Sequence, residues 1–151
     1  MPMTVGFRQK WDAVPSGLQE HCRRVLRRCQ ALAPALSLPP EKVRLCALGH
    51  DLFRASPPGE LLAEAEACGL PVGGVERELP MLLHGPLAAR FLKQVVVAPD
   101  DVVEAVTWHT TGRSGMSTLE KVLFLCDKVE PEKSRGVPEL RRAWHLAARD
   151  L

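Results

Sequence analysis

The sequence lacks the features that would place it in a membrane. None of its apolar runs approaches the length needed to span a bilayer. The first residues, Met-Pro-Met-Thr-Val-Gly-Phe-Arg, also lack the apolar core of a signal peptide. From these absences we expect a protein that has no membrane partner and is located in the cytoplasm.

Cysteines are few and irregularly spaced. The five residues are odd in number and form no Cys-x-x-Cys pair, so neither a disulfide framework nor a structural zinc site is supported. Four of them lie among apolar residues of predicted helices, where a reduced thiol behaves as a small hydrophobic side chain: Cys22, Cys29, Cys46 and Cys126.

The sequence also lacks a large excess of charge of either sign, because the formal net charge is only +2. This balance provides no argument for nucleic acid, and we expect neither DNA nor RNA as a partner. Basic residues cluster near both ends of the chain, at 23–28 and 128–142. Such clusters are usually solvated helix faces, and the alternative is a surface that binds an anionic substrate.

Alternating patterns typical of strands are missing, whereas apolar residues recur at helical spacing in segment after segment. The 151 residues, 46% of them hydrophobic and 25% charged, are the size and composition of one globular domain. We therefore expect an all-α domain over residues 1–151. The spacing and the proline and glycine breaks predict helices over 16–33, from 40 onward, and over 60–68, 86–96, 100–109, 117–130 and 138–151.

Two of these helices have recognisable starts. Ser117-Thr118-Leu119-Glu120 has the form of a capping box and places a helix start at Ser117. Gly85-Pro86 has the form of a cap followed by proline at the first helical position, which places His84 immediately before that helix.

The sequence contains an adjacent histidine and aspartate, His50 and Asp51, and further histidines and an aspartate on apolar helical faces. A single such histidine is more often a core imidazole bonded to the backbone. When four histidines and two inward aspartates need partners, a metal centre within the bundle explains them together. Imidazole and carboxylate suit borderline and hard divalent ions, and the set could hold one or two: His21, His50, Asp51, His84, His109 and Asp127.

These residues and the runs around them resemble the HD-domain metal-dependent phosphohydrolases, and within them the YqeK subfamily of symmetrical diadenosine tetraphosphate hydrolases. The resemblance covers about residues 16 to 145. It rests on Leu83-His84-Gly85-Pro86, on Trp108-His109-Thr110-Thr111-Gly112-Arg113-Ser114-Gly115-Met116-Ser117, on Asp127-Lys128-Val129-Glu130-Pro131, and on Gly136-Val137 with Leu140-Arg141. It implies a single HD-domain helical bundle with a metal centre in its core.

The resemblance also implies which residues hold which ion. The first ion would be held by His21, His50, Asp51 and Asp127, and the second by His84 and His109, with Asp51 bridging the two. It implies two iron ions, although nitrogen and oxygen ligands also suit manganese, zinc, cobalt and nickel. The reaction it implies is in-line attack of a metal-activated water on a phosphoryl group, which converts diadenosine tetraphosphate to two ADP.

Substrate contacts follow from the same resemblance. Arg54 lies one turn after Asp51, where the family more often has lysine, and its guanidinium would stabilise charge on the transferred phosphate, which makes it a catalytic residue beside Asp51. The loop of Thr110, Thr111, Gly112 and Arg113 would contact phosphate or ribose, and its alternative is an ordinary helix-ending loop. Lys128 would contact phosphate, or else be a surface lysine.

Two other functions remain open from the sequence. The same site could act on a different nucleotide, such as a nucleoside phosphate or a cyclic nucleotide, or the protein could be a non-catalytic sensor of nucleotide or metal. A homodimer is a further expectation, with Val95-Val96-Val97 and Trp11 as its candidate interface. The family's chains normally continue beyond the equivalent of Leu151, so we expect a short member or one without a segment that closes the site.

Overall fold

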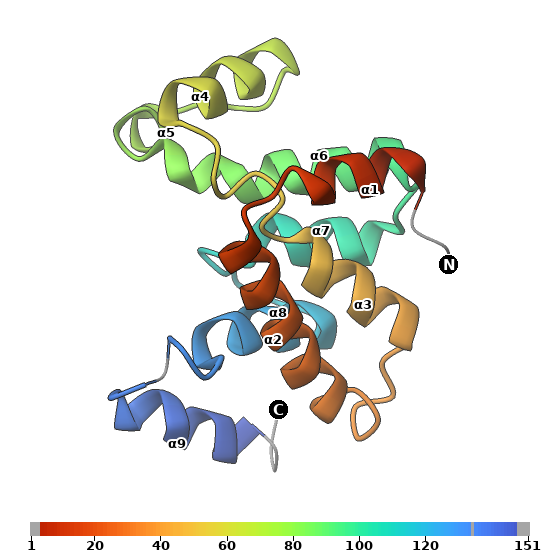
Figure 1. Ribbon diagram of the computed structural model, residues 1–151. Coiled ribbons are helices and arrows are strands. Elements are labelled where there is room, and N and C mark those ends of the chain that lie inside the picture. Colours follow the sequence, from red (N-terminus) through yellow and green to blue (C-terminus); the bar gives the residue numbers. More distant parts are fainter. Residues whose placement is uncertain (1–3, 134, 148–151) are drawn as a thin grey trace.

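In the computed structural model, which describes residues 4–133 and 135–147, every regular element of the described chain is a helix (Figure 1). The all-α class predicted from the sequence is therefore confirmed. In chain order the elements are α1 (Val5–Asp12), α2 (Ser16–Leu32), α3 (Pro40–Gly49), α4 (Pro58–Ala67), α5 (Gly74–Glu78), the 3-10 helix η1 (Pro80–Leu83), α6 (His84–Val95), α7 (Asp100–Trp108), α8 (Thr118–Val129) and α9 (Pro138–Ala147).

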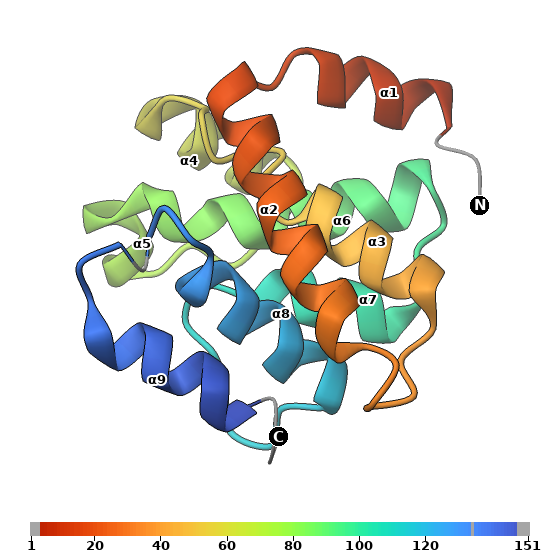
Figure 2. The same ribbon diagram turned by 60° about the horizontal axis from the view of Figure 1, so that its bottom comes forward.

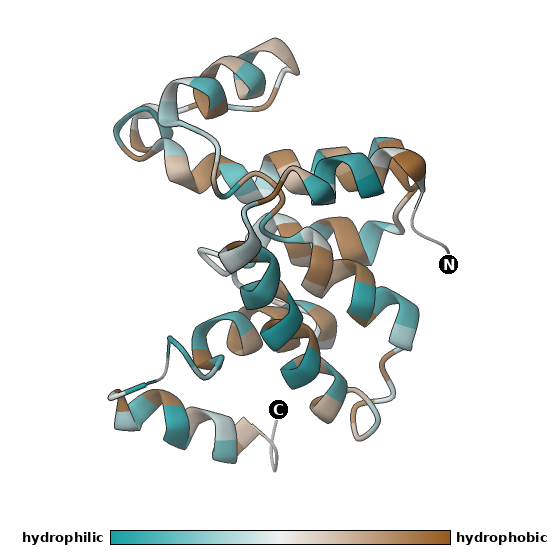
Figure 3. Ribbon diagram, viewed as in Figure 1, coloured by the Kyte–Doolittle hydropathy of each residue, from teal (hydrophilic) through white to brown (hydrophobic). Residues whose placement is uncertain are grey.

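The centre of the bundle is formed by α2, α3, α7 and α8. Helix α2 packs against both α3 and α8, and α7 packs against α6 and α8. Helix α1 lies along α6, and α9 lies beside α8 at the edge of the bundle (Figures 1 and 2). The side of α2 that faces the viewer in Figure 3 is mainly hydrophilic, whereas α7 is mainly hydrophobic. This arrangement brings the buried faces of helices distant in sequence to one place.

The N-terminus of α8 has the predicted capping box. Ser117 Oγ accepts a hydrogen bond from the Glu120 backbone N–H at 3.3 Å, and Glu120 Oε2 accepts one from the Ser117 N–H at 2.8 Å. The two orphan donors at the helix start are thus satisfied, which accounts for a sharp start at this position.

The predicted start of α6 is wrong by two residues. The helix begins at His84 and not at Pro86, because η1 runs directly into it and His84 already has helical dihedral angles, φ −61° and ψ −38°. Helices α1 and α5 were not predicted at all. Both are short, and α5 lies in a segment whose glycines indicate a loop. Residues 148–151 of the predicted last helix lie outside the described residues.

Other expectations concern single side chains. Cys22, Cys29, Cys46 and Cys126 are free and buried, as predicted. Trp11 is buried and stacked on Phe7, so it is not available as the interface residue that we expected. Among the described residues no helix is both long and apolar enough to cross a bilayer.

Candidate metal centre

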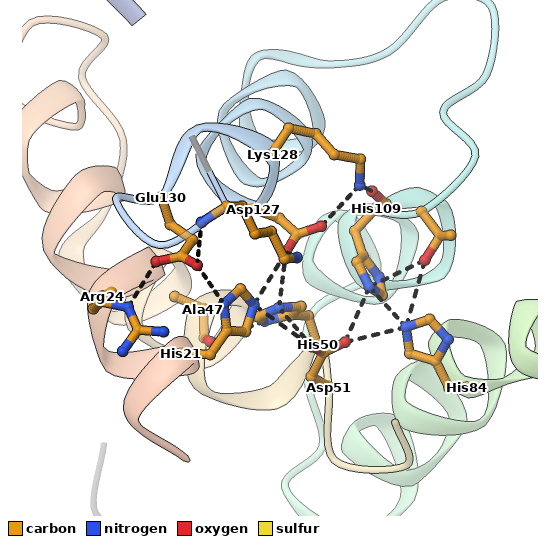
Figure 4. Close-up of polar contacts among 12 residues, drawn as sticks. His21, Arg24, Ala47, His50, Asp51, His84, His109, Asp127, Lys128 and Glu130 are labelled. Carbon is orange, nitrogen blue, oxygen red and sulfur yellow. Dashed lines mark hydrogen bonds and ion pairs between the residues drawn. The ribbon is translucent and has the colours of Figure 1, made fainter. Parts of the chain in front are cut away.

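The six predicted metal ligands converge in the middle of the bundle, and all six are buried (Figure 4). They come from five places in the chain. His21 lies in α2, His50 and Asp51 follow the end of α3, His84 begins α6, His109 follows the last residue of α7, and Asp127 lies in the last turn of α8.

Asp51 lies between two groups of histidines. Its Oδ1 atom is 3.1 Å from His84 Nε2 and 3.5 Å from His109 Nε2. Its Oδ2 atom is 3.6 Å from His21 Nε2 and 3.5 Å from His50 Nε2. Each carboxylate oxygen therefore faces a separate pair of imidazoles, which is the arrangement that a bridging ligand requires.

Asp127 completes the group around the second oxygen of Asp51. Its Oδ1 atom lies 3.1 Å from His21 Nε2 and 3.8 Å from His50 Nε2. Neighbouring ligands bound at about 2.1 Å to one ion, with angles between 90° and 109°, are about 3.0 to 3.4 Å apart. The observed distances are close to this range, and two sets of three ligand atoms each lie within 4.8 Å of one another: those of His21, His50 and Asp51, and those of Asp51, His84 and His109.

Three of the histidines are oriented by hydrogen bonds to their own helical turns. His50 Nδ1 lies 3.0 Å from the Ala47 carbonyl oxygen, and His109 Nδ1 lies 2.7 Å from that of Val106. His84 Nδ1 is bonded to the carbonyl oxygen of the residue three positions before it in the same way. A carbonyl oxygen only accepts, so each Nδ1 carries a proton and each Nε2 is directed at the site, where a neutral ring presents a lone pair.

The protein does not supply a hydrogen-bond donor for each of these Nε2 atoms. The Nε2 atoms of His84 and His109 are 3.1 Å apart, and with both Nδ1 atoms protonated neither neutral ring can donate to the other. The Nε2 atoms of His21 and His50 are buried and make no hydrogen bond. Buried acceptors without donors are costly, and cations placed among them would remove that cost. The donor set therefore fits divalent metal ions.

The protonation states also suit metal binding. Burial lowers the pKa of His50 from 6.5 to about 4, so the ring is neutral at pH 7 and its proximity to Asp51 is not an ion pair. Burial acts to raise the pKa of Asp51, but His50, His109 and His84 outweigh it and leave the pKa well below its usual value. The pKa of Asp127 is lowered in the same sense by His21, His50 and two lysines, against the effect of burial.

The free energy of unfolding of the metal-free protein is expected to decrease as the pH falls from about 6.5 to 4. In this interval the unfolded chain binds a proton at His50 that the folded protein does not, so stability is fully present above pH 6.5 and is lost toward pH 4. The difference in pKa corresponds to roughly 3 kcal/mol. Urea denaturation at a series of pH values measures it. His50→Gln should flatten the profile in this interval, and an unchanged profile would contradict the assignment.

Two lysines approach Asp127 from the solvent side. Lys133 Nζ lies 2.5 Å from Oδ1, and Lys128 Nζ lies 2.8 Å from Oδ2 and donates to the His109 carbonyl oxygen at 3.2 Å. Lys128 was predicted beside the site, whereas Lys133 was noted only as part of a basic cluster. Lys133 lies six residues after Asp127, and this spacing alone does not predict a contact. The turn after α8 brings the Lys133 side chain next to Asp127.

The remaining predicted residues are Arg54 and those of the loop after α7. Thr110 Oγ1 is 3.2 Å from His109 Nε2 and 3.4 Å from His84 Nε2, so its hydroxyl reaches the metal ligands. Thr111 is exposed, and Gly112 has a φ of +67°, which a glycine adopts without strain. Arg54 is exposed, one turn after Asp51.

Arg113 is engaged in ion pairs that hold its loop. Its Nε donates to Glu120 Oε1 at 2.7 Å, and its Nη1 lies 3.1 Å from Glu104 Oε2. These contacts connect the loop to α8 and α7. A contact of Arg113 with substrate stays a prediction.

Replacing Gly85 by alanine is expected to displace His109. A Cβ at this position would lie 3.1 Å from the carbonyl oxygens of Thr107 and Val106 and 3.2 Å from His109 Cε1. Overpacking of this kind costs about 1 to 3 kcal/mol, and here it also moves a ligand ring. Thermal unfolding and metal titration measure the two effects. Gly17→Ala is the matched control, since a Cβ there meets nothing within 4 Å, and equal behaviour of the two variants would contradict the prediction.

The chain belongs to the HD domain family, whose family model matches residues 18–132. Membership of this family implies dependence on a divalent metal, and it confirms the resemblance found in the sequence. Among its relatives is a Bacillus subtilis (strain 168) protein named bis(5'-nucleosyl)-tetraphosphatase, symmetrical. It is 30% identical over 133 residues, which are 87% of this chain and 69% of that protein.

Two further matches agree with this placement. A protein of the same name from Halalkalibacterium halodurans is 44% identical over 62 residues, which are 40% of this chain and 33% of that protein. The crystal structure of a Clostridium acetobutylicum protein, described as a predicted HD superfamily hydrolase involved in NAD metabolism, matches with a TM-score of 0.84 at 29% identity. The match covers 95% of this chain and 78% of that one.

Proposed function

We propose that this protein hydrolyses diadenosine tetraphosphate symmetrically, consuming one water and releasing two ADP. The observation that carries the proposal is the position of Asp51, with each carboxylate oxygen facing its own pair of histidines. The names of the two relatives, symmetrical tetraphosphatases, support this choice of substrate.

Two groups of residues would bind the two metal ions. His21, His50, Asp51 and Asp127 would hold one ion, and His84 and His109 would hold a second that shares Asp51; iron is the metal we propose. When bound, such ions supply Lewis acidity for the phosphoryl oxygens and lower the pKa of the attacking water. The ionised carboxylates and the Nδ1-protonated imidazoles keep the site ready for them.

Cationic and polar side chains at the rim would bind the polyphosphate. Lys128, Lys133 and Arg54 would place positive charge around it, and charge-assisted hydrogen bonds to phosphate are stronger than neutral ones. The Thr110 hydroxyl lies closest to the histidines among the loop residues that we expected to contact substrate, which also include Thr111, Gly112 and Arg113.

The test is to incubate the metal-loaded protein with diadenosine tetraphosphate and identify the products by chromatography. The proposal expects ADP as the sole nucleotide product. ATP together with AMP would contradict symmetrical cleavage, and no turnover would favour the sensor. A panel that includes nucleoside phosphates and cyclic nucleotides tests whether the same site prefers another nucleotide.

Four broader statements stay predictions. They are the single domain over residues 1–151, the cytoplasmic location, the absence of DNA, RNA and membrane partners, and a homodimer. For the homodimer, Val97 is the exposed residue of the valine run that we expected at the interface.

A further inference from the structure

The orientation of His21 differs from that of the other three histidines of the site. His50, His84 and His109 lie at helix ends, and each Nδ1 is bonded to the carbonyl oxygen three residues earlier. His21 lies inside α2, and its Nδ1 atom faces a side chain of another element instead of a carbonyl oxygen of its own helix.

That side chain is Glu130, which follows the last residue of α8. Its Oε1 atom lies 3.5 Å from His21 Nδ1, on the side of the ring away from the metal site (Figure 4). Asp127, one turn earlier in the same helix, lies 3.1 Å from His21 Nε2. The end of α8 thus places one carboxylate against each nitrogen of the same imidazole.

The Glu130 carboxylate is itself held firmly. The side chain is buried, and Arg24 Nε donates to Oε2 at 2.6 Å. The backbone N–H groups of Glu132 and Lys133 donate to Oε2 and Oε1, each at 3.1 Å. Arg24 lies one turn after His21 in α2, so this network fixes α2 to α8 at the level of the ligand.

Glu20 is the other carboxylate that the sequence places beside His21, and it does not have this role. Its side chain is about half exposed and pairs with Arg27 at 3.1 Å and Arg23 at 3.6 Å. It is a solvated residue of the outer face of α2.

We propose that Glu130 is a positioning residue that accepts the Nδ1 proton of His21 in a hydrogen bond and thereby holds this ligand for its metal ion. The proposal rests on the metal site of the proposed function. A carboxylate partner makes a ligating imidazole more basic than a carbonyl partner does, and loss of such a partner typically costs 10- to 100-fold in metal affinity. His21 is the one ligand in the set whose acceptor is a charged side chain, among the residues that the structure describes.

The test measures binding of Mn²⁺ alone, without substrate, by the electron paramagnetic resonance signal of the free ion. Glu130→Ala is expected to weaken Mn²⁺ binding by 10- to 100-fold. The loss should affect the more weakly bound of the two ions or both ions. Glu130→Gln should lose less, because its amide oxygen still accepts a hydrogen bond. The kcat of hydrolysis should also decrease, and it should decrease more in Glu130→Ala than in Glu130→Gln.

Glu120→Gln is the matched control. Glu120 is a buried carboxylate of the same helix that also binds an arginine and a backbone N–H, at 2.7 Å and 2.8 Å, but it faces no metal ligand. Its replacement should leave Mn²⁺ affinity within a few-fold of the unaltered protein. A loss in Glu120→Gln as large as that in Glu130→Ala would overturn the proposal, because the effect would then be one of stability.

A spectroscopic readout covers the case in which Glu130→Ala does not fold. In the Zn²⁺-loaded protein the Nδ1 proton of His21 should be protected from exchange and visible by NMR, and Glu130→Gln should increase its exchange rate. An unchanged exchange rate, or an unaltered protein that binds no Mn²⁺, would overturn the proposal. Failure to cleave diadenosine tetraphosphate with normal Mn²⁺ binding would instead count against the proposed substrate alone.

Discussion

Asp51→Asn is expected to reduce hydrolysis of diadenosine tetraphosphate by more than about 100-fold. Loss of a residue that only orients a metal ligand costs up to about 100-fold, and loss of a proposed ligand should cost more. Asparagine has nearly the same shape, but one oxygen becomes an NH₂ group that donates. This group would face two imidazole Nε2 acceptors, at the 3.1 to 3.6 Å now separating them from the Asp51 oxygens. The variant would thus supply a donor to one pair of imidazoles in the metal-free site and lose the charge that binds both ions.

Initial rates and metal content measured on the same sample check this expectation. Asp100→Asn is the control, since the Asp100 side chain is 89% exposed and pairs with Lys93 on the surface. The control should keep its activity and its metal. If Asp51→Asn retained two ions per chain and activity within a few-fold of the unaltered protein, the bridging role of Asp51 would be wrong.

Removal of metal by a chelator is expected to lower the free energy of unfolding by about 4 kcal/mol, relative to protein with free metal at about 1,000 times its Kd. For a chain of this length this corresponds to a decrease in Tm of about 8 to 16 °C. The physical reason lies in the metal-free site, where the Nε2 lone pairs of His84 and His109 face each other at 3.1 Å and two more buried Nε2 atoms have no donor.

Thermal unfolding followed by circular dichroism, with and without chelator, measures the effect. The change in Tm should be reversed by adding metal and should be much smaller in Asp51→Asn, because that variant has lost the metal before the chelator is added. A chelator effect of the same size in both proteins would contradict the prediction. So would identical unfolding curves of the loaded and stripped unaltered protein.

The six residues of the metal centre were predictable because they are polar residues at positions where the helical pattern expects apolar ones. His50 and Asp127 are polar residues on helical faces that are otherwise apolar, and such residues need partners. The family resemblance then brought the six positions into one site. The roles of Lys133 and Glu130 were not predictable in the same way. A charged residue just after a helix resembles any solvated residue, and only the turn after α8 directs these two toward Asp127 and His21.

Local structure was predicted where local chemistry decides it. The start of α8 depends on two side chains three residues apart, Ser117 and Glu120, and it lies where the capping box predicted. The start of α6 depends on η1, whose 3-10 turn continues into the helix, and here the Gly85-Pro86 pattern was misleading. The extra residues matter because they include His84, whose ring is oriented by the backbone of that turn.

The sequence by itself determined the helical class, the buried polar set and the family, because periodicity, residue chemistry and motif order are local properties that survive without coordinates. Only the tertiary structure decided the two sides of Asp51 and the carboxylate that faces His21 Nδ1. Those features depend on how α2, α3, α6, α7 and α8 pack, and a shift of about 1 Å between helices would break each contact while leaving the sequence pattern unchanged.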